Sequence, residues 1–86
     1  MSIDSSDITG RIRRVLTDHG RLSQPAQLLD VTADLYQAGL TSHASVNVML
    51  GLEGEFDVEF PDQMLSRNVF SSIASIQSAI ETLKAG

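Results

Sequence analysis

Apolar residues recur at helical spacing near both ends of this 86-residue chain. In residues 5–19 they follow the pattern i, i+4, i+7, i+8 and form one stripe, made of Ile8, Ile12, Val15 and Leu16. Ser5 or Ser6 can cap the start of this helix, and Gly20 marks its end. The last helix is expected to begin at Ser71 or Ser72, and it has a similar stripe of Ile73, Ile76, Ile80 and Leu83. Both patterns predict an amphipathic helix with one buried face.

The stretch from Ser42 to Phe56 predicts another helix, which has two apolar faces. Thr41 or Ser42 caps its start, because either hydroxyl can accept a hydrogen bond from an unpaired amide of the first turn. An advance of about 100° per residue places the core face at Ser45, Val48, Met49, Leu52 and Phe56. Val46 and Leu50 lie on a neighbouring face. A small monomer does not need a second apolar face on one helix, so this face needs an explanation beyond the core.

Two connections without a sustained period join these helices. In residues 20–41, Pro25 can open a short helical turn through Leu29, and a second turn can end at Gly39. This segment is too apolar for a free linker, so we expect an ordered loop over the core. Its apolar side chains are Leu28, Leu29, Val31, Leu35, Tyr36 and Leu40. In residues 57–71 we expect a short helix near Pro61. No alternating run predicts a strand, and the whole is a small all-α bundle.

Composition excludes several classes of protein. Two distant histidines and no cysteine leave neither a disulfide framework nor a metal cluster. No apolar run approaches the roughly 18 residues that cross a bilayer, and the N-terminus lacks the basic and apolar regions of a signal peptide. We therefore expect residues 1–86 to form a single domain with one core, in a soluble, monomeric, cytoplasmic protein.

The net charge of −5 is distributed unevenly along the chain. Residues 1–21 have a net charge of +1 and the remainder has −6. Such a surface repels phosphate backbones, which makes DNA and RNA improbable ligands. A basic protein partner suits an acidic surface, although a solvated acidic face needs no partner at all.

No arrangement of residues predicts an enzyme. Ser42 and His43 are adjacent, but neighbours on a helix point about a quarter-turn apart and cannot form a nucleophile–base pair. The acids between Glu53 and Asp62 lack the spacing and the glycine of a calcium loop. Ser42 has a different property, because an anion attached to its hydroxyl would meet the free amides and positive dipole of a helix start. The alternative is that Ser42 is only a helix cap.

The segment around Ser42 resembles the acyl carrier protein family. The residues are Asp34-Leu35-Tyr36-Gln37-Ala38-Gly39-Leu40-Thr41-Ser42-His43, and the family has Asp-Leu, then Gly-Leu or Gly-Met, then Asp-Ser-Leu at a helix start. The likeness continues through Val46 and the run from Leu52 to Asp62, and covers about residues 34–83. It implies a four-helix bundle with a long first loop and a short third helix.

The resemblance also implies a chemistry. The family's serine, here Ser42, is esterified to 4′-phosphopantetheine by a phosphopantetheinyl transferase that uses coenzyme A and magnesium. The terminal thiol of this arm supplies the nucleophile that a chain without cysteine lacks, and it holds cargo as a thioester for partner enzymes. The protein is then a carrier and not an enzyme. Its partner-binding residues are expected to be Thr41, His43, Val46, Leu50 and Glu53.

Departures from the family pattern point to a narrower group. Thr41 stands where the family usually has Asp, which removes a charge that transferases commonly contact, and His43 replaces the usual Leu. Positions that are often acidic in fatty-acid carriers are here Ala44, Asn47 and Gly54. The chain looks closest to stand-alone bacterial aminoacyl carrier proteins. Their partners are amino acid:[carrier protein] ligases, which are similar to class II seryl-tRNA synthetases.

The expected cargo is therefore glycine or another small amino acid. One alternative is a carrier of fatty acyl or other acyl groups, in fatty-acid or secondary-metabolite synthesis. A second alternative, from a different class, is a helical interaction module without a cofactor, which would use the face of Val46 and Leu50 to bind a partner.

Overall fold

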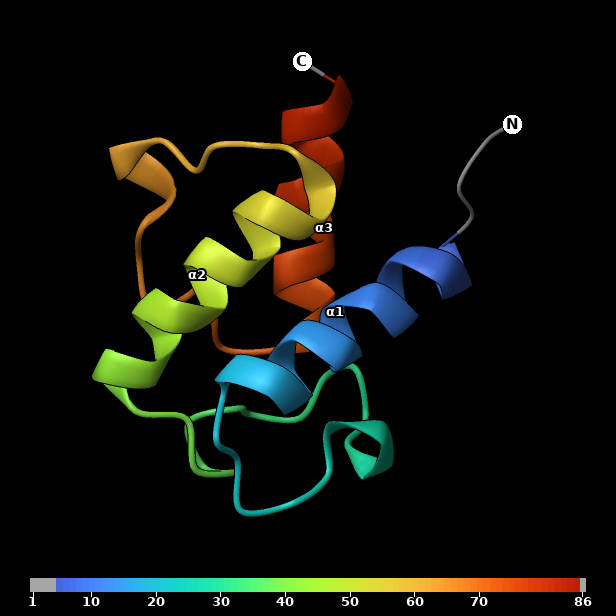
Figure 1. Ribbon diagram of the computed structural model, residues 1–86, viewed down its shortest axis with the longest axis vertical. Helices are drawn as coiled ribbons and strands as arrows, with labels where there is room; N and C mark the ends of the chain where they lie inside the picture. The colour runs from blue at the N-terminus through green and yellow to red at the C-terminus, as the bar shows by residue number, and fades with distance from the viewer. Residues whose placement is uncertain (1–4, 86) are drawn as a thin grey trace.

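The computed structural model describes residues 5–85 and contains three α-helices in that range. They are α1 (Ser5–His19), α2 (Ser42–Phe56) and α3 (Ile73–Ala85), arranged around one core (Figure 1). Two single 3-10 turns, η1 (Ala26–Leu28) and η2 (Asp62–Met64), lie in the connections. The described residues contain no strand, so the all-α prediction is confirmed. No helix in this range is long and apolar enough to cross a membrane.

The periodic segments form helices close to the predicted bounds. α1 ends at His19 as expected, while the predicted caps Ser5 and Ser6 have side chains outside the described part of the structure. α3 begins at Ile73, slightly later than predicted, because Ser72 acts as its cap: the Ser72 hydroxyl accepts a hydrogen bond from the Ser75 amide at 3.1 Å.

The prediction of a short third helix, and with it a four-helix bundle, is not met between residues 57 and 72. That connection contains only η2, whose turn is closed by hydrogen bonds from Met64 to Pro61 and from Leu65 to Asp62. The proline has no amide hydrogen to continue a helix. The apolar residues also lack a common face, since Leu65 is 45% exposed and Phe70 is buried. The segment therefore packs as a looped connection.

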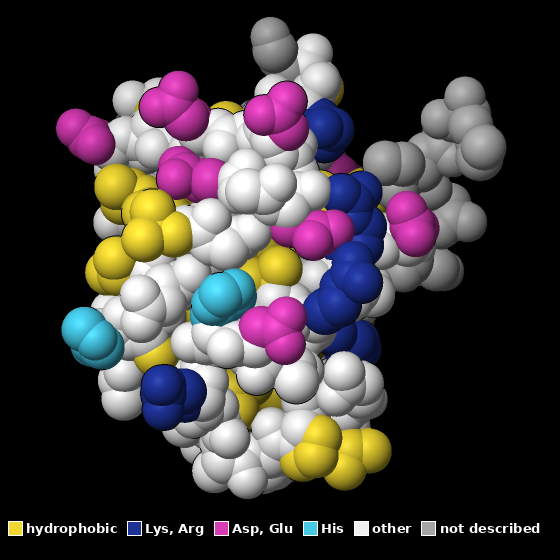
Figure 2. Space-filling view, in the orientation of Figure 1, with side chains coloured by type: hydrophobic (Ala, Val, Ile, Leu, Met, Phe, Trp, Pro, Cys, Tyr) yellow, Lys and Arg dark blue, Asp and Glu magenta, His cyan; other side chains and the backbone are white. Residues whose placement is uncertain are grey.

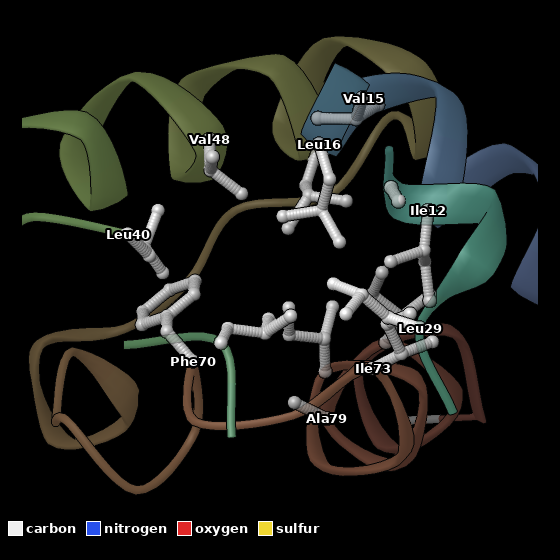
Figure 3. Packing of buried hydrophobic residues seen from close by; sticks show 14 of the residues in the cluster. Ile12, Val15, Leu16, Leu29, Leu40, Val48, Phe70, Ile73 and Ala79 are labelled. Atoms are coloured by element: carbon white, nitrogen blue, oxygen red, sulfur yellow. The ribbon is translucent and has the colours of Figure 1, made fainter. Parts of the chain in front are cut away.

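The core is built from the three helices and closed by the loops. Its fully buried side chains include Ile12 and Leu16 of α1, Val48 and Leu52 of α2, and Ile73, Ile76 and Ile80 of α3. Figure 3 shows Leu16, Val48, Phe70 and Ile73 directed into the same interior. Burial of each such side chain contributes about 1.5–3 kcal/mol, so the common core is what holds the helices together.

On α2 the buried face differs from the predicted one at its start. Ala44 is buried together with Val48, Leu52 and Phe56. Ser45 and Met49 were expected in the core but are only half-buried. The buried positions recur every four residues, so the face that meets α1 and α3 is narrower than the predicted stripe and rotated away from Ser45. Ser45 and Met49 are thereby left at the edge of α2.

The first loop is ordered but only part of it covers the core. Leu29, Leu35 and Leu40 are buried as expected, whereas Leu28 is 76% and Val31 38% exposed, contrary to the prediction. The cause for Leu28 is η1, a turn of three residues that buries Ala26 and directs its neighbours outward. Apolar content predicted an ordered loop correctly but could not show which of its side chains face inward.

Two arginines from the middle of α1 tie this helix to neighbouring elements. Arg13 donates to the carbonyl oxygens of Ala26 and Leu29 at 2.6 and 2.7 Å, which ties η1 to α1. Arg11 pairs with Glu55 at 2.7 Å. The hydrogen bond from Arg11 holds the pKa of Glu55 below its ordinary value. The arginines that the charge pattern placed near the N-terminus therefore join α1 to η1 and α2.

Candidate functional site

Ser42 is the first residue of α2, and its hydroxyl is not used by the helix. The cap is Thr41, whose Oγ1 accepts the Ala44 amide hydrogen bond at 3.0 Å. Within residues 5–85 the Ser42 hydroxyl has no hydrogen-bond partner, and the side chain is exposed. The sequence had left the cap open between Thr41 and Ser42. Because Thr41 takes that role, Ser42 remains available for a chemical group.

The backbone at this point is suited to an anion. The amides of Ser42 and His43 precede the first intrahelical hydrogen bond and have no acceptor among the described residues. The positive end of the helix dipole lies at the same place, and the first turn of α2 contains no acidic side chain. A phosphate ester on Ser42 would therefore meet unpaired amide donors and no negatively charged side chain of that turn to repel it.

The turn before Ser42 is fixed by hydrogen bonds of the Asp34–Thr41 segment. The Asp34 carboxylate accepts from the Tyr36 amide at 2.9 Å, and Ser23 donates its amide to Ala38 at 2.8 Å. Gly39 has a φ of 114°, and a Cβ there would lie 2.9 Å from the Ser23 nitrogen. Only glycine fits at that position without strain. These contacts direct the chain into α2 and set the position of Ser42.

The second apolar face of α2 is exposed, as its sequence pattern predicted. Val46 is 52% and Leu50 56% exposed. Thr41, His43 and Asn47 are exposed near it on α2. Figure 2 shows hydrophobic side chains gathered at one edge of the molecule beside α2, and Lys and Arg side chains along α1. The exposed face is therefore available for contact with a partner.

The structure changes the interpretation of Glu53 as a partner-binding residue and of Ala44 as a surface position that has lost an acid. Glu53 is half-buried, and its carboxylate accepts the Phe60 amide hydrogen bond at 2.9 Å, so it stabilises the connection after α2. Ala44 is 4% exposed, so an acid at this position would face the core. Asn47 and Gly54 are exposed, and the loss of acidic side chains from the surface of α2 applies to these positions only.

A surface hollow of about 480 Å³ opens next to Ser42. It lies between α2 and the two connections, and is lined by Tyr36, Ser42, Ser45, Val46, Met49, Leu65, Ser66, Arg67 and Phe70. The sequence pattern had not brought Tyr36, Leu65, Arg67 and Phe70 to Ser42. A signal existed for Arg67, which is the lone basic residue between Leu22 and Leu83 in a strongly acidic stretch.

The described residues around Ser42 contain neither a base in contact with its hydroxyl nor a group of metal ligands. His43 follows Ser42 directly and makes no hydrogen bond to its hydroxyl. The described residues contain no cluster of His, Cys, Asp and Glu that could hold a metal ion. Activation of Ser42 as a nucleophile needs a base within hydrogen-bond reach. The described side chains provide no such base for the Ser42 hydroxyl.

Comparison with known proteins agrees with this geometry. The family model described as a phosphopantetheine attachment site matches residues 19–80. The chain is 45% identical over 75 residues to an aminoacyl carrier protein of Agrobacterium fabrum, covering 87% of this chain and 90% of the relative. It is 36% identical over 84 residues to aminoacyl carrier protein 1 of Bradyrhizobium diazoefficiens, covering 95% of this chain and 91% of the relative.

The fold is also similar to solved structures. One is a carrier protein from Agrobacterium tumefaciens, solved in complex with an engineered Bradyrhizobium japonicum glycine:[carrier protein] ligase and AMP. It aligns with a TM-score of 0.82 and 45% identity, over 85% of this chain and 97% of that one. A solution structure of an Agrobacterium tumefaciens protein aligns with a TM-score of 0.74 and 44% identity, over 91% of this chain and 94% of that one.

Proposed function

The chain belongs to the family of proteins with a phosphopantetheine attachment site, and on this premise we propose that it is an aminoacyl carrier protein. Ser42 bears the 4′-phosphopantetheine arm, and the thiol of the arm holds a small amino acid such as glycine as a thioester. The chain itself is a carrier and not a catalyst. The observation that carries the assignment of Ser42 is its free, exposed hydroxyl at the start of α2, inside the matched region.

The residues around Ser42 fit such an arm. The unpaired amides at the start of α2 favour a phosphodiester on the neighbouring hydroxyl. The chain contains no cysteine, so a thiol for thioester chemistry has to be supplied by the arm. When bound, the arm supplies that thiol. The residues of the chain hold the point of attachment and present the exposed face of α2.

Two partner enzymes follow from this function. A phosphopantetheinyl transferase, with coenzyme A and magnesium, adds the arm, and an amino acid:[carrier protein] ligase resembling class II seryl-tRNA synthetases loads it. We place both contacts on the start of α2, at Thr41, His43, Val46 and Leu50. Glu53 was included in this face, but its carboxylate is already engaged with Phe60, so we expect a smaller role for it. Both enzymes consume soluble substrates, coenzyme A for the transferase and ATP for the ligase, and we propose that the carrier works with them in the cytoplasm.

A carrier of fatty acyl groups is the second candidate, because the hollow beside Ser42 is mainly apolar and measures about 480 Å³. Three observations favour the aminoacyl carrier. The relatives named above are aminoacyl carriers. The hollow is open at the surface, with Val46 and Leu65 about half exposed. The interior between α2 and α3 is filled by fully buried side chains, among them Val48, Leu52 and Ile76.

Loading separates these candidates. The protein is first treated with coenzyme A and transferases of broad and narrow specificity, and intact mass shows whether one arm is added. The modified protein is then offered to ligases with ATP and a panel of amino acids and fatty acids. We expect one arm on the parent, none on Ser42→Ala, and loading by glycine or another small amino acid.

Each contrary result has a distinct meaning. An arm on Ser42→Ala would show that the attachment point is wrong. Loading by fatty acids alone would favour the acyl carrier. If no transferase adds an arm, and a partner binds the unmodified protein tightly, the chain is a cofactor-free interaction module.

A further inference from the structure

The hollow beside Ser42 contains a single charged side chain, Arg67, which is held in place without being neutralised. Its guanidinium carbon lies 3.8 Å from the centroid of the Tyr36 ring, a stacked cation–π contact. Within residues 5–85 the guanidinium has no hydrogen bond or ion pair. Because the stacked contact uses the flat face of the group, the N–H donors along its edge stay free to bind an anion.

The backbone that carries the Tyr36 ring is anchored by two hydrogen bonds. The Tyr36 amide donates to the Asp34 carboxylate at 2.9 Å. The preceding residue, Leu35, is fully buried, and its amide donates to the Ser71 carbonyl oxygen at 2.7 Å. The first loop and the connection before α3 are therefore joined at the residue next to Tyr36. Arg67 stands at a defined place on the wall of the hollow.

The remaining lining matches a short chain that begins with an anion. Ser42 is part of the wall, so a phosphodiester on it would start inside the hollow with Arg67 as the available cation. Beyond it lie the apolar side chains of Val46, Met49 and Phe70. The pantetheine chain carries branched methyl groups next to its phosphate, which suit such a surface. A volume of about 480 Å³ is within the range of small-molecule sites, about 300–1,000 Å³.

We propose that Arg67 is a positioning residue for the arm: it pairs with the phosphodiester on Ser42 and lays the pantetheine chain along the hollow. The inference rests on the proposed function. The hollow is open at the surface, with Val46 and Leu65 about half exposed, so the thiol end of the arm and its cargo stay within reach of a partner enzyme. The hollow thus holds the arm and leaves the cargo exposed.

A carboxylate of a partner enzyme is the competing anion for Arg67. The phosphodiester has the advantage of being tethered at the wall of the same hollow, where its effective concentration is on the order of millimolar or higher. A partner carboxylate would reach Arg67 only within the complex. The arm should therefore occupy this site in the free carrier protein.

The test compares the protein with and without the arm by NMR. Parent, Arg67→Gln and Arg21→Gln are modified, and intact mass confirms one arm on each. Arg21 is exposed and lies outside the hollow, so Arg21→Gln removes the same charge as a matched control. In the parent and the control we expect NOEs from the arm's methyl groups to Met49 and the Tyr36 ring, and amide shifts confined to the hollow.

In Arg67→Gln we expect these NOEs to be lost, the amide shifts to fall at least twofold, and the ³¹P resonance of the phosphodiester to move. Arg67→Lys should regain part of the contacts through its charge, which a purely structural role would not explain. The inference would be overturned if the NOEs persist in Arg67→Gln. It would also be overturned if adding the arm to the parent leaves the amide chemical shifts of the hollow unchanged. A defect of Arg67→Gln in ligase loading with the arm contacts intact would overturn it as well, because Arg67 would then serve the partner.

The mass measurement separates failure of this inference from failure of the proposed function. If the parent accepts no arm, the proposed function is wrong and the inference falls with it. If the arm is present on Ser42 but makes no contact with the hollow, the carrier function stands and the role of Arg67 alone is refuted.

Discussion

The packing of α1 against α2 depends on a glycine, and the substitution Gly51→Ala tests this directly. A Cβ at position 51 would lie 2.7 Å from Cδ2 of His19 and 2.9 Å from Cγ1 of Val15. Both distances are shorter than real contacts allow, so a neighbour has to move. His19 is exposed and can rotate away. Val15 is buried and β-branched, which leaves it few alternative rotamers in a helix.

Gly54 provides a matched control on the same helix. A Cβ there would meet nothing within 4 Å, and the residue is exposed. Replacing glycine by alanine raises helix propensity by up to about 1 kcal/mol at either site, while overpacking costs about 1–3 kcal/mol at Gly51. We therefore expect Gly54→Ala to be as stable as the parent or more so, and Gly51→Ala to be less stable than Gly54→Ala by about 1–3 kcal/mol.

Denaturant unfolding followed by far-ultraviolet circular dichroism measures the difference. For a domain of this size about 1 kcal/mol corresponds to about 4–8 °C in Tm, so thermal unfolding provides a second measurement. Equal stabilisation by Gly51→Ala and Gly54→Ala would refute the reasoning, since it would mean that α1 does not approach α2 closely at Gly51.

Three further expectations concern the site and its support. Ser42→Ala should abolish modification, as judged by intact mass, and cost less stability than Thr41→Ala, which removes the cap and should cost about 1 kcal/mol; the reverse order would show that Ser42 is the cap. Leu50→Asp should weaken binding to the ligase by at least about tenfold, or about 1.4 kcal/mol, with little effect on Tm, whereas Leu28→Asp, on the exposed first loop, should bind like the parent; equal binding by both variants would refute the docking face. Glu55→Gln should be less stable than the parent at neutral pH. Because the folded-state pKa of Glu55 is lowered, the stability that its carboxylate contributes is present above about pH 4.3 and is lost as the pH falls through the lowered value. The free energies of unfolding of the parent and Glu55→Gln should therefore converge in acid; a difference between them that stays constant at all pH values would contradict this.

The sequence predicted the helices well because their signals are local. Ser42–Phe56 was predicted and observed with the same bounds, since its apolar period and its flanking residues lie in one continuous segment. The third helix was predicted without a clean period, and the structure has only η2 there. Where the pattern was strong the prediction was correct, and where it was weak Pro61 and the tertiary packing decided the conformation.

Predictions for the site divide in a similar way. The exposed apolar face of Val46 and Leu50 was predicted from helical geometry alone, and both side chains are more than half exposed. The choice between Thr41 and Ser42 as cap depended on backbone geometry that either hydroxyl could satisfy in the sequence. The hollow was not predictable, because most of its lining comes from connections that have no period.

The sequence by itself determined that the chain forms an all-α domain, which of its serines begins α2, and that α2 carries an apolar face beyond what its core needs. Only the tertiary structure decided that the Ser42 hydroxyl is free, that α1 touches α2 at Gly51, and that Arg67 stacks on Tyr36 beside Ser42. The physical reason is range. Helical period and capping act between residues a few positions apart, whereas these contacts join separate segments that meet only once the core has formed.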